Sequence, residues 1–126
     1  MKRIFCLSLL ILCLMTSCQS QKKIVSVNKD TNEFTMRKGQ DCEIMFRTNA
    51  STGFWWQWVN EEEVTIVESV GDRYESDAPK GMVGASSNRY WKFHAKERGT
   101  QTLKFVYARD NQNESIKTRE VTITVK

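Results

Sequence analysis

The chain has 126 residues, of which 40% are hydrophobic, and it carries a formal net charge of +4. This length suits one domain and is short for two. Without Lys2 and Arg3, which we expect to be removed with a leader, 17 basic side chains stand against 15 acidic ones, a net charge of +2. A balance this small excludes nucleic-acid binding as the favoured function.

The N-terminus has the pattern of an export signal. Lys2 and Arg3 supply a positive start, and residues 4–15 form a nearly unbroken apolar run that is too short for a permanent membrane span. The run ends in Met15-Thr16-Ser17-Cys18, which resembles a bacterial lipobox, although Met15 stands where Leu is more usual. At a lipobox the peptidase cuts before the cysteine, and the thiol then carries lipid.

We therefore expect a lipoprotein signal peptide over residues 1–17, a lipidated Cys18 with a polar tether over 18–23, and a folded domain over 24–126. This predicts a bacterial cell-envelope protein held by lipid, on the periplasmic or the cell-surface face. An ordinary secretory signal or a membrane anchor is the alternative.

The cysteines predict a domain without disulfides. Cys6 and Cys13 leave with the signal and lipid occupies Cys18, so only Cys42 remains. The mature chain of 109 residues must therefore be held together by its apolar core.

From residue 24 onward, apolar and polar residues alternate with the period of a strand. Strands are predicted over residues 24–27, 33–36, 42–47, 54–59, 64–70, 88–95, 102–109 and 116–125. Seven or eight short antiparallel strands joined by polar turns predict an all-β, immunoglobulin-like β-sandwich. A barrel is the alternative, because periodicity does not separate the two.

The alternation also assigns side chains to faces. The inward positions are Cys42, Ile44, Phe46, Trp56, Trp91, Phe93, Ala95, Leu103, Phe105, Tyr107, Val121, Ile123 and Val125. Arg89 and His94 are expected to point outward, and Trp55 lies opposite Trp56. The longest run of one charge, Glu61-Glu62-Glu63, is interpreted as a solvated turn.

The segment over residues 48–56 is irregular and carries a motif. It resembles the Asn-Pro-Thr-Thr-Gly-Tyr-x-Trp signature of chagasin-type inhibitors of cysteine peptidases. The matching residues are Asn49, Thr52, Gly53 and Trp56. Ala50, Ser51 and Phe54 replace Pro, Thr and Tyr.

Two later segments extend the resemblance. Where the family typically has Val-Gly-x-Gly-Gly, this chain has Val83, Gly84, Ala85, Ser86 and Ser87, preceded by Met82. Where the family often has Arg-Pro-Trp, this chain has Arg109, Asp110 and Asn111. The two serines and the Asp-Asn pair depart from the family pattern, which bears on inhibitory strength and target choice more than on fold.

The resemblance covers nearly the whole mature chain and implies three loops at one end of the sandwich. In such inhibitors these loops form a wedge across the active-site cleft of papain-like peptidases and block the catalytic cysteine without covalent reaction. It thus implies a monomeric, reversible peptidase inhibitor that needs no cofactor.

The residues of the first loop suit such a wedge. Gly53 permits a tight turn and close backbone approach, while Asn49, Ser51 and Thr52 can bond local backbone groups and stiffen the loop. For Arg109, contact with a partner and support of its own loop stay open. Met82 and Val83 either anchor an interface or tuck under their loop.

An enzyme is disfavoured by parity. Cys42 and His94 are the only nucleophile–base candidates, and they are predicted on opposite faces of the sheet. One histidine and one free cysteine make no closed zinc set, and no phosphate-binding or dinucleotide motif is present.

Two rival functions stay open from the sequence. One is a surface adhesion or assembly module that keeps the sandwich but has lost inhibition, which the departures in the second and third segments favour. The other is glycan binding through exposed aromatic residues such as Trp55 and Tyr90.

Overall fold

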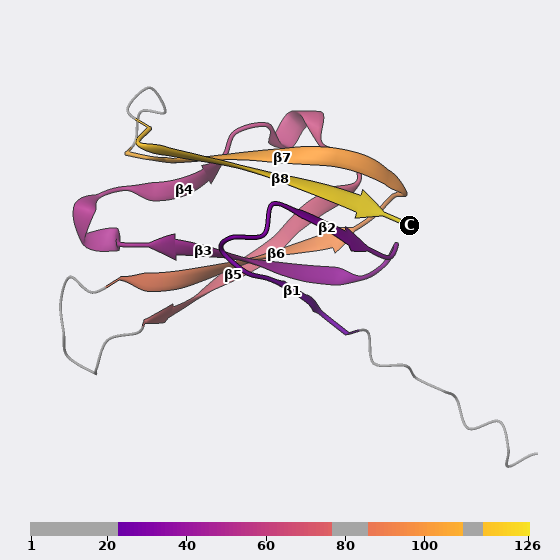
Figure 1. Cartoon of the computed structure of the whole chain (residues 1–126), viewed down its shortest axis with the longest axis horizontal. Coiled ribbons are helices and arrows are strands. Elements are labelled where there is room, and N and C mark those ends of the chain that lie inside the picture. The colour runs from indigo at the N-terminus through magenta and orange to yellow at the C-terminus, as the bar shows by residue number, and fades with distance from the viewer. Residues whose placement is uncertain (1–22, 77–85, 110–114) are drawn as a thin grey trace, which may run out of the picture.

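The computed structural model describes residues 23–76, 86–109 and 115–126, and these form a two-layer β-sandwich (Figure 1). One sheet has the strand order β1-β3-β6-β5 and the other β2-β8-β7-β4. The strands are β1 (Val25–Val27), β2 (Glu33–Met36), β3 (Asp41–Thr48), β4 (Trp55–Trp58), β5 (Val67–Ser76), β6 (Ser87–Ala95), β7 (Gly99–Ala108) and β8 (Lys117–Val125). All of them lie after Lys23, so a chain that begins at Gln19 keeps every described element.

The predicted sandwich of eight strands is confirmed, with one correction to its pairing. β1 pairs with β3 and β2 pairs with β8 in parallel, so both sheets are mixed rather than wholly antiparallel. The cause is the short link at residues 28–32, which carries the chain from one sheet to the other. A crossing link lets consecutive strands run beside different partners, whereas a hairpin would force them antiparallel to each other.

One predicted strand lies later in the chain than expected. The expected strand over 64–70 begins only at Val67 and continues to Ser76 as an edge strand. Before it, the backbone N–H groups of Thr65 and Ile66 donate to the side-chain oxygen of Gln101, at 2.9 and 3.0 Å. A side chain therefore takes the place that a partner strand would have here.

The core is aromatic and matches the predicted inward face. Phe46 lies at its centre, with ring centroids 5.1 Å from Trp56 and 4.8 Å from Phe105. Each offset or edge-to-face pair of this kind contributes about 0.5–1.5 kcal/mol beyond burial itself. Trp91 is only half-buried, and the other predicted inward residues are buried.

The outward prediction for Arg89 is wrong. Arg89 lies two residues from Trp91 and therefore on the same, inner face, where its guanidinium sits 3.9 Å from the Trp91 ring centroid. It is 12% exposed and donates to the Trp56 carbonyl of the other sheet at 2.8 Å and to the Asp72 carboxylate at 2.7 Å. The long apolar stem lets a charged residue occupy an inward position at the margin of the core.

Arg119 makes the corresponding connection at the opposite margin. From β8 it donates to the Met45 carbonyl on β3 at 2.7 Å. It also donates to the Asn28 and Thr31 carbonyls in the link between β1 and β2, both at 2.8 Å. Burial lowers the pKa of the Arg119 guanidinium, while Asp30 raises it. The two arginines thus connect the sheets at their margins, whereas a buried disulfide connects them in antibody domains.

Candidate functional site

The irregular segment over residues 49–53, called the first loop here, closes one end of the sandwich (Figure 1). It joins β3 to β4 through a short 3-10 turn at Ala50–Thr52. The ends of the other strands gather beside it, because Thr48 pairs with Ser87, Ser87 pairs with Ser76, and Trp55 pairs with Ala108. The strand ends that flank the second and third predicted segments therefore lie at the same end as the first loop.

The structure tests those two segments only at their margins. Met82, Val83, Gly84, Ala85, Asp110 and Asn111 lie outside the described residues. Ser87 is the first residue of β6 rather than part of a loop, and Ser86 precedes it directly. Where the family has a glycine, Ser87 instead continues the sheet.

Hydrogen bonds within the first loop hold its shape. The Asn49 side-chain oxygen accepts from the Ser51 backbone N–H at 3.2 Å and from the Ser51 hydroxyl at 2.6 Å. The Thr52 hydroxyl donates to the Asn49 carbonyl at 2.8 Å and lies 3.4 Å from the Phe54 N–H. The local hydrogen bonds predicted for Asn49, Ser51 and Thr52 are present, and bonds of this kind favour a stiff loop.

Two core residues fasten the base of the first loop. The Trp56 indole N–H donates to the Arg47 carbonyl at 2.9 Å, so it joins the strand that enters the loop to the strand that leaves it. The Tyr107 hydroxyl accepts from the Asn49 N–H at 3.0 Å. Both residues were predicted as core from parity alone, and parity gives no signal for these polar contacts.

Arg109 supports the first loop from the end of β7. Its guanidinium lies 4.8 Å from the Phe54 ring centroid. Its carbonyl accepts from the Gln57 side chain at 3.0 Å. Beside it, Gly53 has a φ of +78°, a conformation that L side chains rarely adopt. Both roles predicted for Arg109 stay open, because the rest of its own loop lies outside the described residues and its exposed side chain contacts Phe54 beside the first loop.

A shallow hollow of about 230 Å³ lies beside the first loop. Its lining includes Asn49, Thr52, Phe54, Ser86, Tyr107 and Lys117. Ile116, also in its lining, is 60% exposed. Ile116 and Lys117 could not be predicted here from the sequence, because their position follows from the pairing of β7 with β8.

The chemistry of the described residues does not resemble a catalytic centre. Cys42 is fully buried, and burial raises the pKa of its thiol to about 12, so the reactive thiolate is disfavoured at neutral pH. His94 pairs with Asp41 on the outer face, at 2.5 Å between Nδ1 and Oδ1. The predicted separation of Cys42 from His94 is confirmed. Within the described ranges, no His, Cys, Asp and Glu side chains cluster as a metal site.

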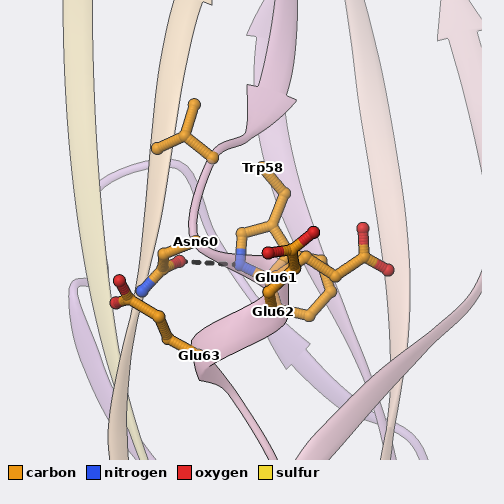
Figure 2. A pocket seen from close by; sticks show the side chains of 6 residues that line it. Trp58, Asn60, Glu61, Glu62 and Glu63 are labelled. Carbon is orange, nitrogen blue, oxygen red and sulfur yellow. Dashed lines mark hydrogen bonds between the residues drawn. The ribbon is translucent and has the colours of Figure 1, made fainter.

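A second hollow, of about 250 Å³, lies at the end of β4 away from the first loop (Figure 2). It is formed by the 3-10 turn Glu61–Glu63, and the Trp58 indole donates to Asn60 there at 3.0 Å. Figure 2 shows the Glu63 carboxyl pointing away from those of Glu61 and Glu62. All three glutamates are exposed, which confirms the predicted solvated turn.

Comparison with known proteins assigns the family. The profile of the chagasin family of peptidase inhibitors, I42, matches residues 35–125. The chain belongs to this family. The comparison with curated protein sequences gives no match.

Solved structures share the fold of this chagasin-family chain. The cysteine protease inhibitor EhICP2 from Entamoeba histolytica is 23% identical, with a TM-score of 0.66 over 82% of this chain and 96% of its own. Amebosin is 24% identical, with a TM-score of 0.63 over 82% of this chain and 99% of its own. A structure of PbICP-C in complex with falcipain-2 is 15% identical, with a TM-score of 0.50 over 84% of this chain and 92% of that one.

The bond at the base of the first loop gives a prediction for Trp56→Phe. Losing the indole donor leaves the Arg47 carbonyl without this partner, so the free energy of unfolding should fall by about 1–3 kcal/mol in urea titrations. Amide hydrogen exchange at residues 49–53 should accelerate in the same variant. Trp55→Phe is the control, because Trp55 is 47% exposed, and it should change stability by less than about 0.5 kcal/mol. Unchanged loop exchange in Trp56→Phe would contradict the proposed fastening.

Proposed function

We propose that the mature chain is a reversible inhibitor of papain-like cysteine peptidases. In this proposal it inserts the first loop and the two neighbouring segments into the active-site cleft. Lipid on Cys18 holds it in the bacterial cell envelope. Membership of the chagasin family supports peptidase inhibition over an adhesion module or a glycan-binding protein. The solved complex of PbICP-C with falcipain-2 supports a cysteine peptidase as the partner.

The observation that carries the proposal is the set of hydrogen bonds that hold the first loop in one conformation. Three of its side chains bond within the loop, and Trp56 and Tyr107 fasten its base. A loop that is ordered before binding loses little conformational entropy in the complex, which favours tight association. The same bonds oppose the extended conformation that a peptidase needs for cleavage, so the loop can occupy a cleft without becoming a substrate.

The position of the first loop also suits a tethered inhibitor. β1 runs parallel to β3, and Val25 pairs with Cys42, seven residues before the first loop begins at Asn49. At about 3.3 Å per residue, the start of β1 lies roughly 23 Å from the loop. The first loop and the C-terminal Lys126 lie at opposite ends of the molecule (Figure 1). Anchoring before β1 would therefore present the first loop away from the membrane. The described residues include no helix able to cross a bilayer.

The direct test is inhibition of several papain-like peptidases by the chain from Gln19 to Lys126. We expect competitive inhibition that is reversed by dilution and leaves the inhibitor uncut. Inhibition absent at micromolar concentration against every enzyme tested would refute the proposed function.

Gly53→Leu tests whether the first loop carries inhibition. A side chain at φ +78° should cost about 1–2 kcal/mol of stability, whereas inhibition should weaken about a hundredfold, which is ~2.8 kcal/mol of binding. Gly71→Leu is the matched control, because Gly71 also has positive φ (+138°) and open space around it. It should lose similar stability and keep inhibition. Equal losses of inhibition in both variants would contradict a site on the first loop.

The lipid anchor gives a separate prediction for Cys18→Ser. In a bacterium that processes lipoproteins, the unaltered chain should fractionate with membranes and show the mass of an added lipid. The variant lacks the thiol and should lose both properties, while the purified Cys18→Ser chain should inhibit as strongly as the chain that begins at Gln19. Membrane association that survives Cys18→Ser would contradict lipid anchoring.

A further inference from the structure

A groove of about 570 Å³ opens between β3 and β8, on the side of the sandwich where the sheets are incompletely covered. β1 pairs only with Cys42–Ile44 of β3, and β2 pairs only from Thr122 of β8 onward. Toward the first loop, β3 and β8 therefore each have an edge with no described strand beside it. The groove is lined by residues that include Lys29, Asp30, Phe46, Trp56, Lys117 and Arg119, and is called the basic groove here.

Lys29, Lys117 and Arg119 form no ion pair with a described carboxylate. Arg119 donates to three backbone carbonyls, which are neutral acceptors. No described carboxylate lies within 4.0 Å of the charged nitrogens of Lys29, Lys117 or Arg119. Among the described residues of the lining, Asp30 is the only carboxylate, and its charge raises the pKa of Arg119. The basic groove thus concentrates positive charge on a chain whose mature net charge is only +2.

The basic groove leads to the first loop. Arg47 and Lys117 line it, and both also line the hollow beside Asn49, Thr52 and Phe54. The two depressions therefore share a boundary, and a protein seated on the first loop would also lie over the Lys117 side of the groove.

We propose that the basic groove is a docking flank that receives acidic side chains from the rim of the target peptidase's cleft, and that it favours peptidases with an acidic rim. This inference rests on the proposed function. Charges at the edge of an interface act mainly on the association rate constant, because they steer the encounter before close contact forms. An anionic membrane is the less favoured occupant, because the groove leads to the first loop, and that loop lies about 23 Å, roughly seven strand residues, from the start of β1.

Charge reversal tests the basic groove. The double variant Lys29→Glu with Lys117→Glu is compared with Lys38→Glu with Lys126→Glu, which makes the same change of net charge at exposed positions. The Lys38 N–H bonds the Lys126 carbonyl at 3.0 Å, so the control pair is also close together in space, beyond the strand ends farthest from the first loop. Thermal unfolding confirms that both variants are folded.

Association and dissociation rate constants are measured by stopped flow with two papain-like peptidases, one with an acidic and one with a basic surface around the cleft. For the acidic enzyme at low salt, the groove variant should associate about tenfold more slowly, and the control less than about twofold. At about 0.5 M salt the difference should nearly vanish, because the Debye length falls to only a few Å. Dissociation should change less than about twofold.

The outcomes separate the two levels of the proposal. Tight inhibition with equal association rate constants in all variants would overturn the docking role of the basic groove and leave the proposed function intact. Binding of anionic lipid vesicles that is lost only in the groove variant, without an effect on association with the peptidase, would assign the groove to a membrane instead. Absence of inhibition by the unaltered chain would overturn the proposed function and this inference together.

Discussion

The hydrogen bond from the Trp56 indole to the Arg47 carbonyl, 2.9 Å long, is the interaction on which the first loop depends. It crosses from one sheet to the other and joins the residues on either side of the loop. The same indole is 7% exposed and packs its ring 5.1 Å from Phe46, so the bond is held in place by the centre of the core. A loop fastened in this way inherits the rigidity of the sandwich beneath it.

The arginines extend the same principle to the margins of the sheets. Strand edges carry backbone groups that need partners, and here side chains of the opposite sheet supply them. Arg89 donates a hydrogen bond to the Trp56 carbonyl, and Arg119 donates one to the Met45 carbonyl. Five donors in a fixed plane suit arginine to this role, and its charge is retained even when burial lowers its pKa. The sheets are thus cross-linked by hydrogen bonds in a domain where Cys42, the one described cysteine, is free and buried.

The parts of the fold that follow from side-chain alternation could be predicted from the sequence. The buried faces of β3, β7 and β8 and the exposure of Trp55 follow from parity, because in-register strands fix which side chains face the core. The parallel pairing of β1 with β3 and of β2 with β8 could not be predicted, because it depends on a link that crosses between the sheets. Arg89 was misassigned because charge suggested solvent, although its spacing from Trp91 placed it on the inner face.

The site was predictable where the bonds are local and not where they are long-range. The contacts of Asn49, Ser51 and Thr52 span two or three residues, so residue type and spacing are enough to suggest them. The contact of Tyr107 with Asn49 spans 58 residues, and the hollow at Lys117 depends on strand order. The basic groove also depends on long-range contacts, because it brings the link between β1 and β2 beside the start of β8.

Membership of the chagasin family and a rigid loop at one end of the sandwich together give the central claim, that the first loop is the surface that binds a peptidase. Hydrogen–deuterium exchange of the chain from Gln19, alone and with an excess of a papain-like peptidase, tests it most directly. The account predicts added protection at residues 49–54 and none at Glu61–Glu63, which lie at the far end of β4. Complex formation that leaves residues 49–54 unprotected while protecting the β5 edge would contradict it.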